Sequence, residues 1–343
     1  MQKQQPRKIE RDIIMRILRV ELRQGAASFV IATLLAACIG CGEEENTMLF
    51  HAGAGQRSSL LDIKKAFEAR RPDVSINFSF KGSGFFIADI ERSKEGDLYL
   101  PGEEFYVLQA FERGFLEPYD PDKDVAAYFM PVIMTPKGNP KNVRKVADFA
   151  RPGVRVSLAN PKSAAIGIWH QKVFKKAGIW EQVRKNQVQS PKCAPEVLTG
   201  VQHAVVDATI MWSSTAVLAL RDIEIIPLEP EYRGFAKLPV GVVRPPYCKH
   251  PKVARELKDF ILSDEGKAIF RSHAYVIDPG PLDEDGFCAD GGEASAEDCR
   301  WIVQAARVCK DESLPVNEQT CGCLIKEVRR QRQTKRAGTL EQQ

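Results

Sequence analysis

Four short stretches rich in glycine, serine and other small residues stand where a strand-like run passes into a helix-like run. They comprise residues 52–59, 82–85, 160–167 and 212–215. At such a junction the first backbone N–H groups of the helix lack partners within the helix, and its positive end faces the same point. Neutral donors can hold an anion there, and glycine allows it close to the backbone. A plain turn with a capped helix is the simpler explanation of any one junction, but four of them favour an anion site.

The charges at these junctions favour binding over catalysis. Acidic residues are few there, and Arg57 offers a full positive charge. Arg57 either pairs with the anion or caps a neighbouring acidic surface, and the sequence leaves both open. The chain has no G-x-S-x-G nucleophile elbow, no H-E-x-x-H pair and no G-x-x-x-x-G-K-[ST] phosphate loop. We therefore predict no catalytic residue, no metal site and no cofactor.

Strand-like and helix-like segments alternate between about residues 47 and 278, and they must position these junctions. The run VSINFSF (residues 74–80) alternates apolar and polar side chains, as a strand with one buried face does. The run before it, SSLLDIKKAFEARR, opens with a capping box, keeps its apolar residues on one helical face and stops at Pro72. This alternation indicates an α/β fold in which crossover helices cover a sheet.

Six stretches resemble, in their order along the chain, the periplasmic molybdate/tungstate-binding proteins of ABC importers. They are LFHAGAGQRSSLLDI, FKGSGFF, GDLYLPG, VIMTPKGNPK, GVRVSLANPKSAAIG and VDATIMW. The resemblance covers about residues 47–278 and implies an α/β, two-lobed periplasmic-binding-protein (Venus flytrap) fold. It assigns residues 47–130 and 242–278 to the first lobe and residues 131–241 to the second. The chain would cross between the lobes near residues 130–136 and 239–243.

The resemblance also implies which residues face the ligand. In this family an oxyanion lies between the lobes, bound by backbone N–H groups and small hydroxyls, so cavity size and donor number set the specificity. The family's second-loop serine matches Ser83, and its tyrosine falls on Trp212, which can donate only from its indole. Its first-loop serine has no match here. The other positions assigned to the ligand are Ala54, Gly55, Gln56 and Arg57 in the first loop, Gly84 beside Ser83, Ala165 and Ile166 in the third loop, and Ala194 in the fourth.

The first 37 residues have the features of a bacterial lipoprotein signal peptide. Within residues 1–24, seven basic side chains against three acidic ones precede a short apolar run that ends in LAAC at Cys38. The run is too short to span a bilayer. We expect acylation at Cys38 and a tether over residues 38–46, with Cys41 as a weaker site and Met15 as an alternative start. Residues 1–24 account for the whole net charge of +4, so the rest of the chain is near neutral. Its charge therefore does not indicate nucleic-acid binding.

Five of the nine cysteines lie near the end of the chain, at Cys288, Cys299, Cys309, Cys321 and Cys323. Disulfides are the default for such a cluster in an exported chain. We expect residues 279–328 to form a small helical hairpin in which Cys299 and Cys309 face Cys321 and Cys323. This piece either staples the fold or binds a partner. Residues 329–343 are expected to be a disordered basic tail.

Together these patterns predict an extracytoplasmic solute-binding lipoprotein. It would bind an oxyanion, molybdate or tungstate first, and pass it to an ABC permease while the lipid at Cys38 holds it on the periplasmic side of the membrane. Its mechanism would be lobe closure without a chemical reaction. An extracytoplasmic sensor or scaffold that uses the same fold to bind another anion or a protein is the alternative.

Overall fold

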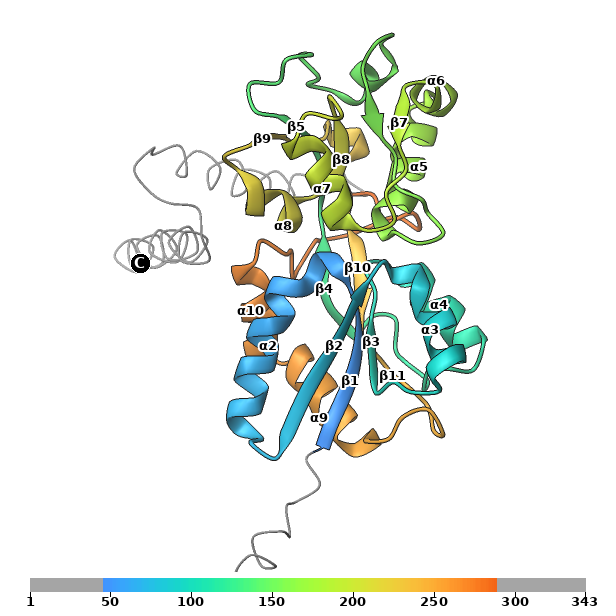
Figure 1. The fold of residues 1–343 in the computed structure, drawn as a ribbon, viewed down its shortest axis with the longest axis vertical. Coiled ribbons are helices and arrows are strands. Elements are labelled where there is room, and N and C mark those ends of the chain that lie inside the picture. Colours follow the sequence, from blue (N-terminus) through green and yellow to red (C-terminus); the bar gives the residue numbers. More distant parts are fainter. Residues whose placement is uncertain (1–45, 289–343) are drawn as a thin grey trace, which may run out of the picture. The chain divides into compact units, whose positions relative to one another are not determined.

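The computed structural model describes residues 46–288, which Figure 1 shows as two lobes joined by extended segments. The predicted signal peptide, Cys38 and nearly all of the tether lie outside the described residues. So do the predicted disulfide candidates Cys299, Cys309, Cys321 and Cys323, and the basic tail. Within residues 46–288, no helix is both long enough and apolar enough to cross a bilayer.

The first lobe is built on a four-stranded sheet with the order β11-β3-β1-β2. Its strands are β1 (Asn46–Gly53), β2 (Val74–Lys81), β3 (Leu98–Leu100) and β11 (Gly241–Val242). β1 runs parallel to β2 and β3, whereas β11 runs antiparallel to β3. Gly53 at the end of β1 is in register with Lys81 at the end of β2. The two glycine-rich turns that follow these strands therefore begin side by side at one edge of the sheet.

The first lobe also contains five α-helices: α2 (Arg57–Arg70), α3 (Phe86–Ser93), α4 (Glu104–Glu112), α9 (Pro251–Leu262) and α10 (Asp264–Ser272). Two 3-10 turns, η1 (Ala54–Gln56) and η2 (Ser83–Phe85), lead into α2 and α3. α2 buries Leu60, Ile63 and Phe67, the face that the apolar spacing predicts. It ends at Arg70, just before the proline that the sequence marks as a stop.

The second lobe has a three-stranded antiparallel sheet, β8-β5-β9, and a parallel pair, β6 with β7. The strands are β5 (Pro131–Pro136), β6 (Val156–Ser157), β7 (Gln187–Gln189), β8 (Thr209–Trp212) and β9 (Ile223–Ile226). The helices are α5 (Ala165–Lys176), α6 (Trp180–Lys185), α7 (Ala194–Gln202) and α8 (Ser213–Ala216), with 3-10 turns η3 (Val146–Ala150), η4 (Val217–Ala219) and η5 (Pro230–Tyr232). As in the first lobe, helices begin shortly after strands end. The N-terminal ends of several helices therefore face the other lobe.

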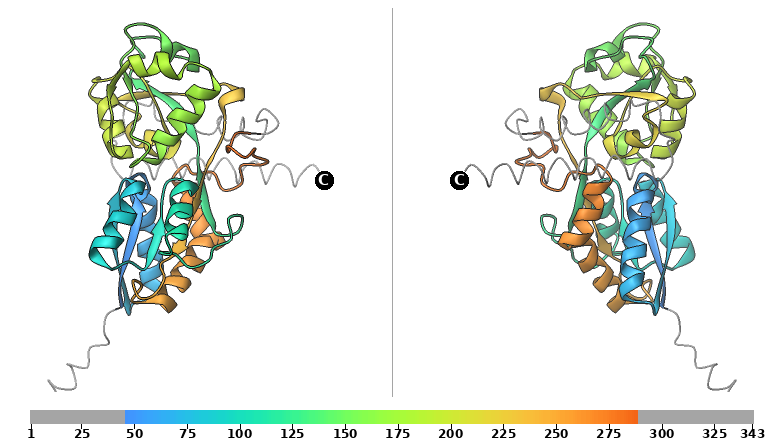
Figure 2. Two further views of the ribbon diagram at one scale, coloured as in Figure 1. Left: turned by 90° about the vertical axis from the view of Figure 1, so that its right-hand side faces the viewer. Right: turned by 90° about the vertical axis from the view of Figure 1, so that its left-hand side faces the viewer.

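Two antiparallel strands, β4 (Val125–Phe129) and β10 (Ala236–Pro239), connect the lobes (Figure 2). Only Met130 separates β4 from β5, so the first crossing falls at this residue. β10 pairs with β4 and packs against α4 of the first lobe. The chain has therefore returned to the first lobe by Ala236, earlier than the crossing at 239–243 that the resemblance implies.

After α10 the chain continues as an extended strap, residues 276–288. Val276 and Tyr128 of β4 exchange two backbone hydrogen bonds, of 2.8 and 3.1 Å, on the first lobe. Near its end, the Phe287 ring packs edge-on against Trp169 of α5 in the second lobe, with 5.4 Å between ring centroids. The strap thus runs from one lobe to the other, and this first part of the predicted cysteine-containing hairpin is a turn rather than a helix.

Candidate functional site

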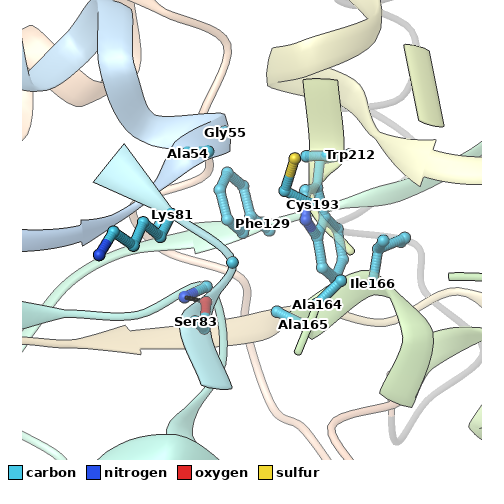
Figure 3. Close-up of a pocket in the computed structure, with 14 residues that line it drawn as sticks. Ala54, Gly55, Lys81, Ser83, Phe129, Ala164, Ala165, Ile166, Cys193 and Trp212 are labelled. Carbon is cyan, nitrogen blue, oxygen red and sulfur yellow. Dashed lines mark hydrogen bonds between the residues drawn. The ribbon is translucent and has the colours of Figure 1, made fainter. Parts of the chain in front are cut away.

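A small cavity lies between the two lobes, which belong to one compact unit of the chain. Its volume is about 20 Å³, above the roughly 10–15 Å³ that one water needs, so it suits a ligand of few atoms. Figure 3 shows that main-chain atoms and small side chains form much of its wall. The lining residues are Gly53, Ala54, Gly55, Lys81, Gly82, Ser83, Gly102, Phe129, Ala164, Ala165, Ile166, Cys193, Ala194 and Trp212.

Seven of the ten residues predicted to face the ligand line this cavity, namely Ala54, Gly55, Ser83, Ala165, Ile166, Ala194 and Trp212. The other three, Gln56, Arg57 and Gly84, do not. The sequence did not single out Lys81, Gly102 or Phe129, which also line the cavity. Gly102 belongs to the GDLYLPG stretch, whereas the aromatic residue at the end of β4 carries no local signal of a site.

The first turn, after β1, brings Ala54 and Gly55 to the cavity at the start of η1. Their N–H groups open a helical turn and so have no acceptor within it. Gln56 is fully buried, but its side-chain amide donates to the carbonyl oxygen of Pro101 at 2.8 Å, away from the cavity. Arg57 is exposed, and its guanidinium lies over the Phe80 ring, 4.9 Å from the centroid. Neither Gln56, expected to contribute its backbone N–H, nor Arg57, expected to contribute its side chain, lines the cavity.

Ser83, in the second turn, is held so that its hydroxyl can donate to a ligand. The hydroxyl oxygen accepts the Gly102 N–H at 2.9 Å, and the Ser83 carbonyl accepts the Tyr99 hydroxyl at 2.6 Å. No acceptor for the Ser83 hydroxyl proton is found among residues 46–288. With one lone pair occupied, the buried hydroxyl acts toward the cavity chiefly as a donor.

Gly82 and Gly84 lie against the second lobe, and Gly82 also lines the cavity. The Gly84 N–H donates to the carbonyl oxygen of Ser163 at 3.0 Å, so this predicted ligand donor is already used. A Cβ atom added to Gly84 would lie 1.9 Å from the carbonyl oxygen of Lys162. One added to Gly82 would lie 2.2 Å from that of Lys192. Glycine is needed here because the backbones of the two lobes touch.

The second lobe contributes two helix starts to the cavity. Ala165 and Ile166 begin α5, and Ala194 begins α7 after the half-buried Cys193. The N–H groups of Ala165 and Ile166 in α5 and of Ala194 in α7 have no acceptor within their helices and are free to meet an anion, whereas Pro195, the second residue of α7, has no N–H. That interaction needs no charged side chain, since the N-terminal end of a helix carries partial positive charge.

A buried histidine fixes the turn before α5. The Nδ1 atom of His170 accepts the Ala159 N–H at 3.0 Å, and its Nε2 atom donates to the Ile210 carbonyl at 2.8 Å. Burial lowers the pKa of His170 to about 4. The ring is therefore neutral at physiological pH and serves as a structural link between α5 and β8.

Aromatic rings close one side of the cavity. Trp212 stacks on Phe129 with 4.8 Å between ring centroids and an angle of 8° between the rings. The two residues end β8 and β4, one in each lobe. Of the predicted junction at residues 212–215, only Trp212 lines the cavity. The hydroxyls of Ser214 and Thr215 are buried, and Thr215 Oγ1 would lie 3.3 Å from a Cβ atom added to Gly55.

Neutral groups dominate the electrostatics of the site. None of the lining residues is Asp, Glu or His, and the only charged one is Lys81. The Lys81 ammonium pairs with Asp89 at 2.7 Å and extends away from the cavity in Figure 3. Within residues 46–288, no group of three or more His, Cys, Asp or Glu side chains could hold a metal ion.

The sequence left open whether Cys193 and Cys248 form a disulfide. Cys193 lines the cavity from the second lobe, whereas Cys248 is buried in the first lobe, with its Sγ atom 3.3 Å from Asp97. Both are thiols. Burial and the neighbouring carboxylate raise the pKa of Cys248 to about 12, and burial raises the pKa of Cys193, so both thiols are protonated.

Contacts outside the cavity hold the lobes together. The Tyr106 hydroxyl of α4 donates to the Pro161 carbonyl at 2.7 Å. The Lys172 ammonium of α5 lies 3.6 Å from the buried carboxylate of Glu103, which caps α4. These contacts join α4 of the first lobe to the second lobe and describe a closed arrangement.

Residues 49–276 match the sequence model of a family described as bacterial extracellular solute-binding protein. The matched range includes every residue that lines the cavity. A sequence relative is the molybdate-binding protein ModA of Mycobacterium bovis, which is 23% identical over 264 residues that cover 73% of this chain and 97% of ModA.

Two solved structures show the same fold. The sulfate-binding protein SubI from Mycobacterium tuberculosis H37Rv gives a TM-score of 0.61 at 18% identity, over 68% of this chain and 88% of SubI. The periplasmic binding protein AfuA from Actinobacillus pleuropneumoniae, with fructose-6-phosphate bound, gives 0.58 at 16% identity, over 76% of this chain and 97% of AfuA. The molybdate, sulfate and sugar phosphate named for these proteins share an anionic tetrahedral group.

Proposed function

This chain belongs to the bacterial extracellular solute-binding protein family, and from that premise we propose that it captures a small tetrahedral oxyanion between its lobes. Molybdate and tungstate are the first candidates. The captured ion is delivered to the permease of an ABC importer, and acylation at Cys38 keeps the protein at the membrane while it does so. The protein carries the ion without transforming it.

The observation that supports this proposal is a cavity supplied with donors from both lobes. Helix starts at Ala54, Ala165 and Ala194 bring backbone N–H groups, and Ser83 adds a hydroxyl donor. Such fixed dipoles can replace the hydration shell of a dianion without a counter-ion. The absence of carboxylate and imidazole side chains from the lining residues leaves a protonated anion, such as hydrogen phosphate, without an obvious acceptor for its proton.

The size of the cavity favours a free oxyanion over an ester. A volume of about 20 Å³ leaves no room for the sugar of a sugar phosphate in this closed arrangement. The chemistry of the wall also gives no route to a reaction, because none of the lining side chains is a general base or an activated nucleophile. Binding and release by lobe movement is the function that remains.

Sulfate is the second candidate, and one observation favours it. Trp212 stands where the molybdate-binding family places a tyrosine, so one hydroxyl donor is missing and the ring fills part of the wall. Fewer donors and a smaller space suit an ion smaller than molybdate. The family resemblance therefore ranks molybdate first, whereas the donor number and cavity size at Trp212 rank sulfate first, and direct competition between the two ions decides the order.

Calorimetry tests the proposal. The mature chain with Cys38→Ser, which takes no lipid, is titrated with molybdate, tungstate, sulfate and phosphate. We expect at least one of the first three to bind with a Kd of about 1 μM or tighter, equivalent to about −8 kcal/mol, and phosphate to bind more weakly. A chain that folds and gives no heat with any of the four ions contradicts the proposal.

A further inference from the structure

The helix α4 carries an exposed apolar stripe on the first lobe. Phe105, Leu108 and Phe111 are 45%, 43% and 40% exposed, and their spacing of three residues places them along one side of the helix. The opposite side is the buried one and contains Tyr106, Val107 and Ala110. Within residues 46–288, no other helix or strand has more than one large hydrophobic side chain so exposed.

Two hydrogen bonds hold α4, the helix that carries this stripe, in place. The Glu103 carboxylate caps α4 by accepting the Phe105 N–H at 2.7 Å. The Tyr106 hydroxyl joins the helix to Pro161 of the second lobe. Three apolar side chains held at the surface of a well-anchored helix form a surface that another apolar element can cover.

The described chain ends close to this surface. The Lys172 ammonium donates to the carbonyl oxygen of Asp285 in the strap at 2.8 Å and lies 3.6 Å from the Glu103 carboxylate at the start of α4. The strap therefore passes beside the start of the stripe, three residues before Cys288. A further 55 residues follow Cys288.

Residues 295–309, SAEDCRWIVQAARVC, fit the stripe in both pattern and charge. Their sequence repeats apolar residues at helical spacing, with Trp301, Ala305 and Val308 on one side. Arg300 and Arg307 lie beside this side and Glu297 lies on it. Charges of the opposite sign are available on α4 at Glu104 and Glu112 and at Arg113 directly after the helix. The six residues 289–294 can span up to about 20 Å, which exceeds the length of about 13 Å that nine helical residues have.

We propose that residues 295–309 of the same chain dock on α4, with Trp301, Ala305 and Val308 against Phe105, Leu108 and Phe111. Burial of the three exposed side chains stabilises the contact, and flanking ion pairs add a smaller contribution. The strap on the second lobe and the docked segment on the first then belong to one continuous C-terminal extension. This extension joins the lobes at a place away from the cavity.

Photo-crosslinking in the full chain tests the docking. A benzophenone amino acid replaces Leu108 on α4, and in a matched control it replaces Leu61 on α2, which is 42% exposed and lies in the same lobe. After irradiation and proteolysis, we expect a cross-link from position 108 to a peptide within residues 295–309, and none from position 61. The cross-link should persist on dilution because it forms within one chain.

Three outcomes contradict the proposal. One is a cross-link from position 108 that joins two copies of the chain and disappears on dilution. Another is a cross-link that forms only to a membrane partner, and the third is capture of residues 295–309 equally from both positions. As a second measurement, Trp301→Asp in the full chain should abolish the cross-link and speed hydrogen exchange of the α4 backbone amides. Unchanged exchange and an undiminished cross-link in that variant also overturn the proposal.

Discussion

The two glycine-rich turns of the first lobe have similar sequences and different neighbours. Both follow parallel strands that end in register, and both lead into a 3-10 turn and a helix. A Cβ atom on Gly53 or Gly55 would come no closer than 3.3 Å to another atom. On Gly82 or Gly84 it would lie 1.9 to 2.5 Å from backbone oxygens of the second lobe.

This contrast shows that one sequence feature has two uses. In the first turn, glycine keeps the cavity open beside backbone N–H groups, where the proposed anion would lie. In the second turn, glycine allows another backbone to approach, while Ser83 between the two glycines faces the cavity. Backbone atoms cannot move aside as side chains do, so the second turn is expected to be the less tolerant of substitution.

The largest effect is expected from Gly84→Ala. The added methyl group overlaps the Lys162 carbonyl, which prevents the lobes from reaching the closed arrangement. We expect anion affinity to fall about a hundredfold or more, which corresponds to roughly 3 kcal/mol. Calorimetry with the anion that binds the parent protein measures this loss. Because the clash exists only between the lobes, the melting temperature of the ligand-free protein should change little, and an unfolded variant would show that the turn has a role within its own lobe.

A smaller loss is expected from Ser83→Ala. This change removes the hydroxyl donor and leaves the Gly102 N–H without its acceptor. We expect a cost of about 1–3 kcal/mol in binding free energy, measured by the same titration. Ser58→Ala provides the control, because Ser58 is half-buried in the first turn of α2 and does not line the cavity. Equal losses in the two variants would place the ligand elsewhere.

Gly55→Ala should have an intermediate effect that tests the first turn. The new methyl group would lie 3.3 Å from the Ala194 side chain and from the Thr215 hydroxyl, a contact that a shift of a few tenths of an ångström relieves. We expect binding to weaken by about 1 kcal/mol, far less than for Gly84→Ala. A loss as large as that of Gly84→Ala would remove the distinction between the two turns.

The features that could be predicted from the sequence depend on residues close together in the chain. The start of a helix leaves N–H groups free wherever the chain folds, so Ala54 and Ala165 could be placed at strand-to-helix junctions, whereas Ala194 was named only through the resemblance. The alternation in β2 and the apolar face of α2 are equally local. The structure shows the face of α2 in full and the alternation at Val74 and Ile76, the buried residues of β2. The two-lobed fold followed from the order of these elements together with the resemblance.

What the sequence could not predict depends on distant partners. The Gly84 N–H donates to the carbonyl oxygen of Ser163, about eighty residues away in the chain. The sequence could not show that this N–H joins the two lobes. Phe129 enters the wall only because β4 ends beside Trp212 at the crossing. The return of the chain at Ala236 depends on pairing between β10 and β4, which composition does not specify.

Tyr106→Phe tests whether contacts between the lobes contribute to affinity without touching the ligand. It removes the hydrogen bond to the Pro161 carbonyl and keeps the ring. We expect a loss of about 0.5–1.5 kcal/mol, seen mainly as faster anion release in stopped-flow measurements, because the closed state becomes less populated. An unchanged release rate would mean that the Tyr106 hydrogen bond does not stabilise the closed state. The contact between the second turn and the second lobe would then be sufficient to hold it.

The smallest effect is expected from Arg57→Gln, which sharpens the description of the first turn. Arg57 is the one full positive charge in that turn, yet its guanidinium is exposed and lies over Phe80 rather than in the cavity. Its attraction for a bound anion is therefore screened by water and salt, and we expect affinity to stay within about twofold of the parent value. The lost contact with Phe80 should appear instead as a slightly lower melting temperature, since an exposed cation–π contact contributes about 0.5–1 kcal/mol. Titration at low and high salt separates the two roles: a large loss of affinity that grows as the salt is lowered would show that the first turn binds its ligand by charge as well as by backbone dipoles.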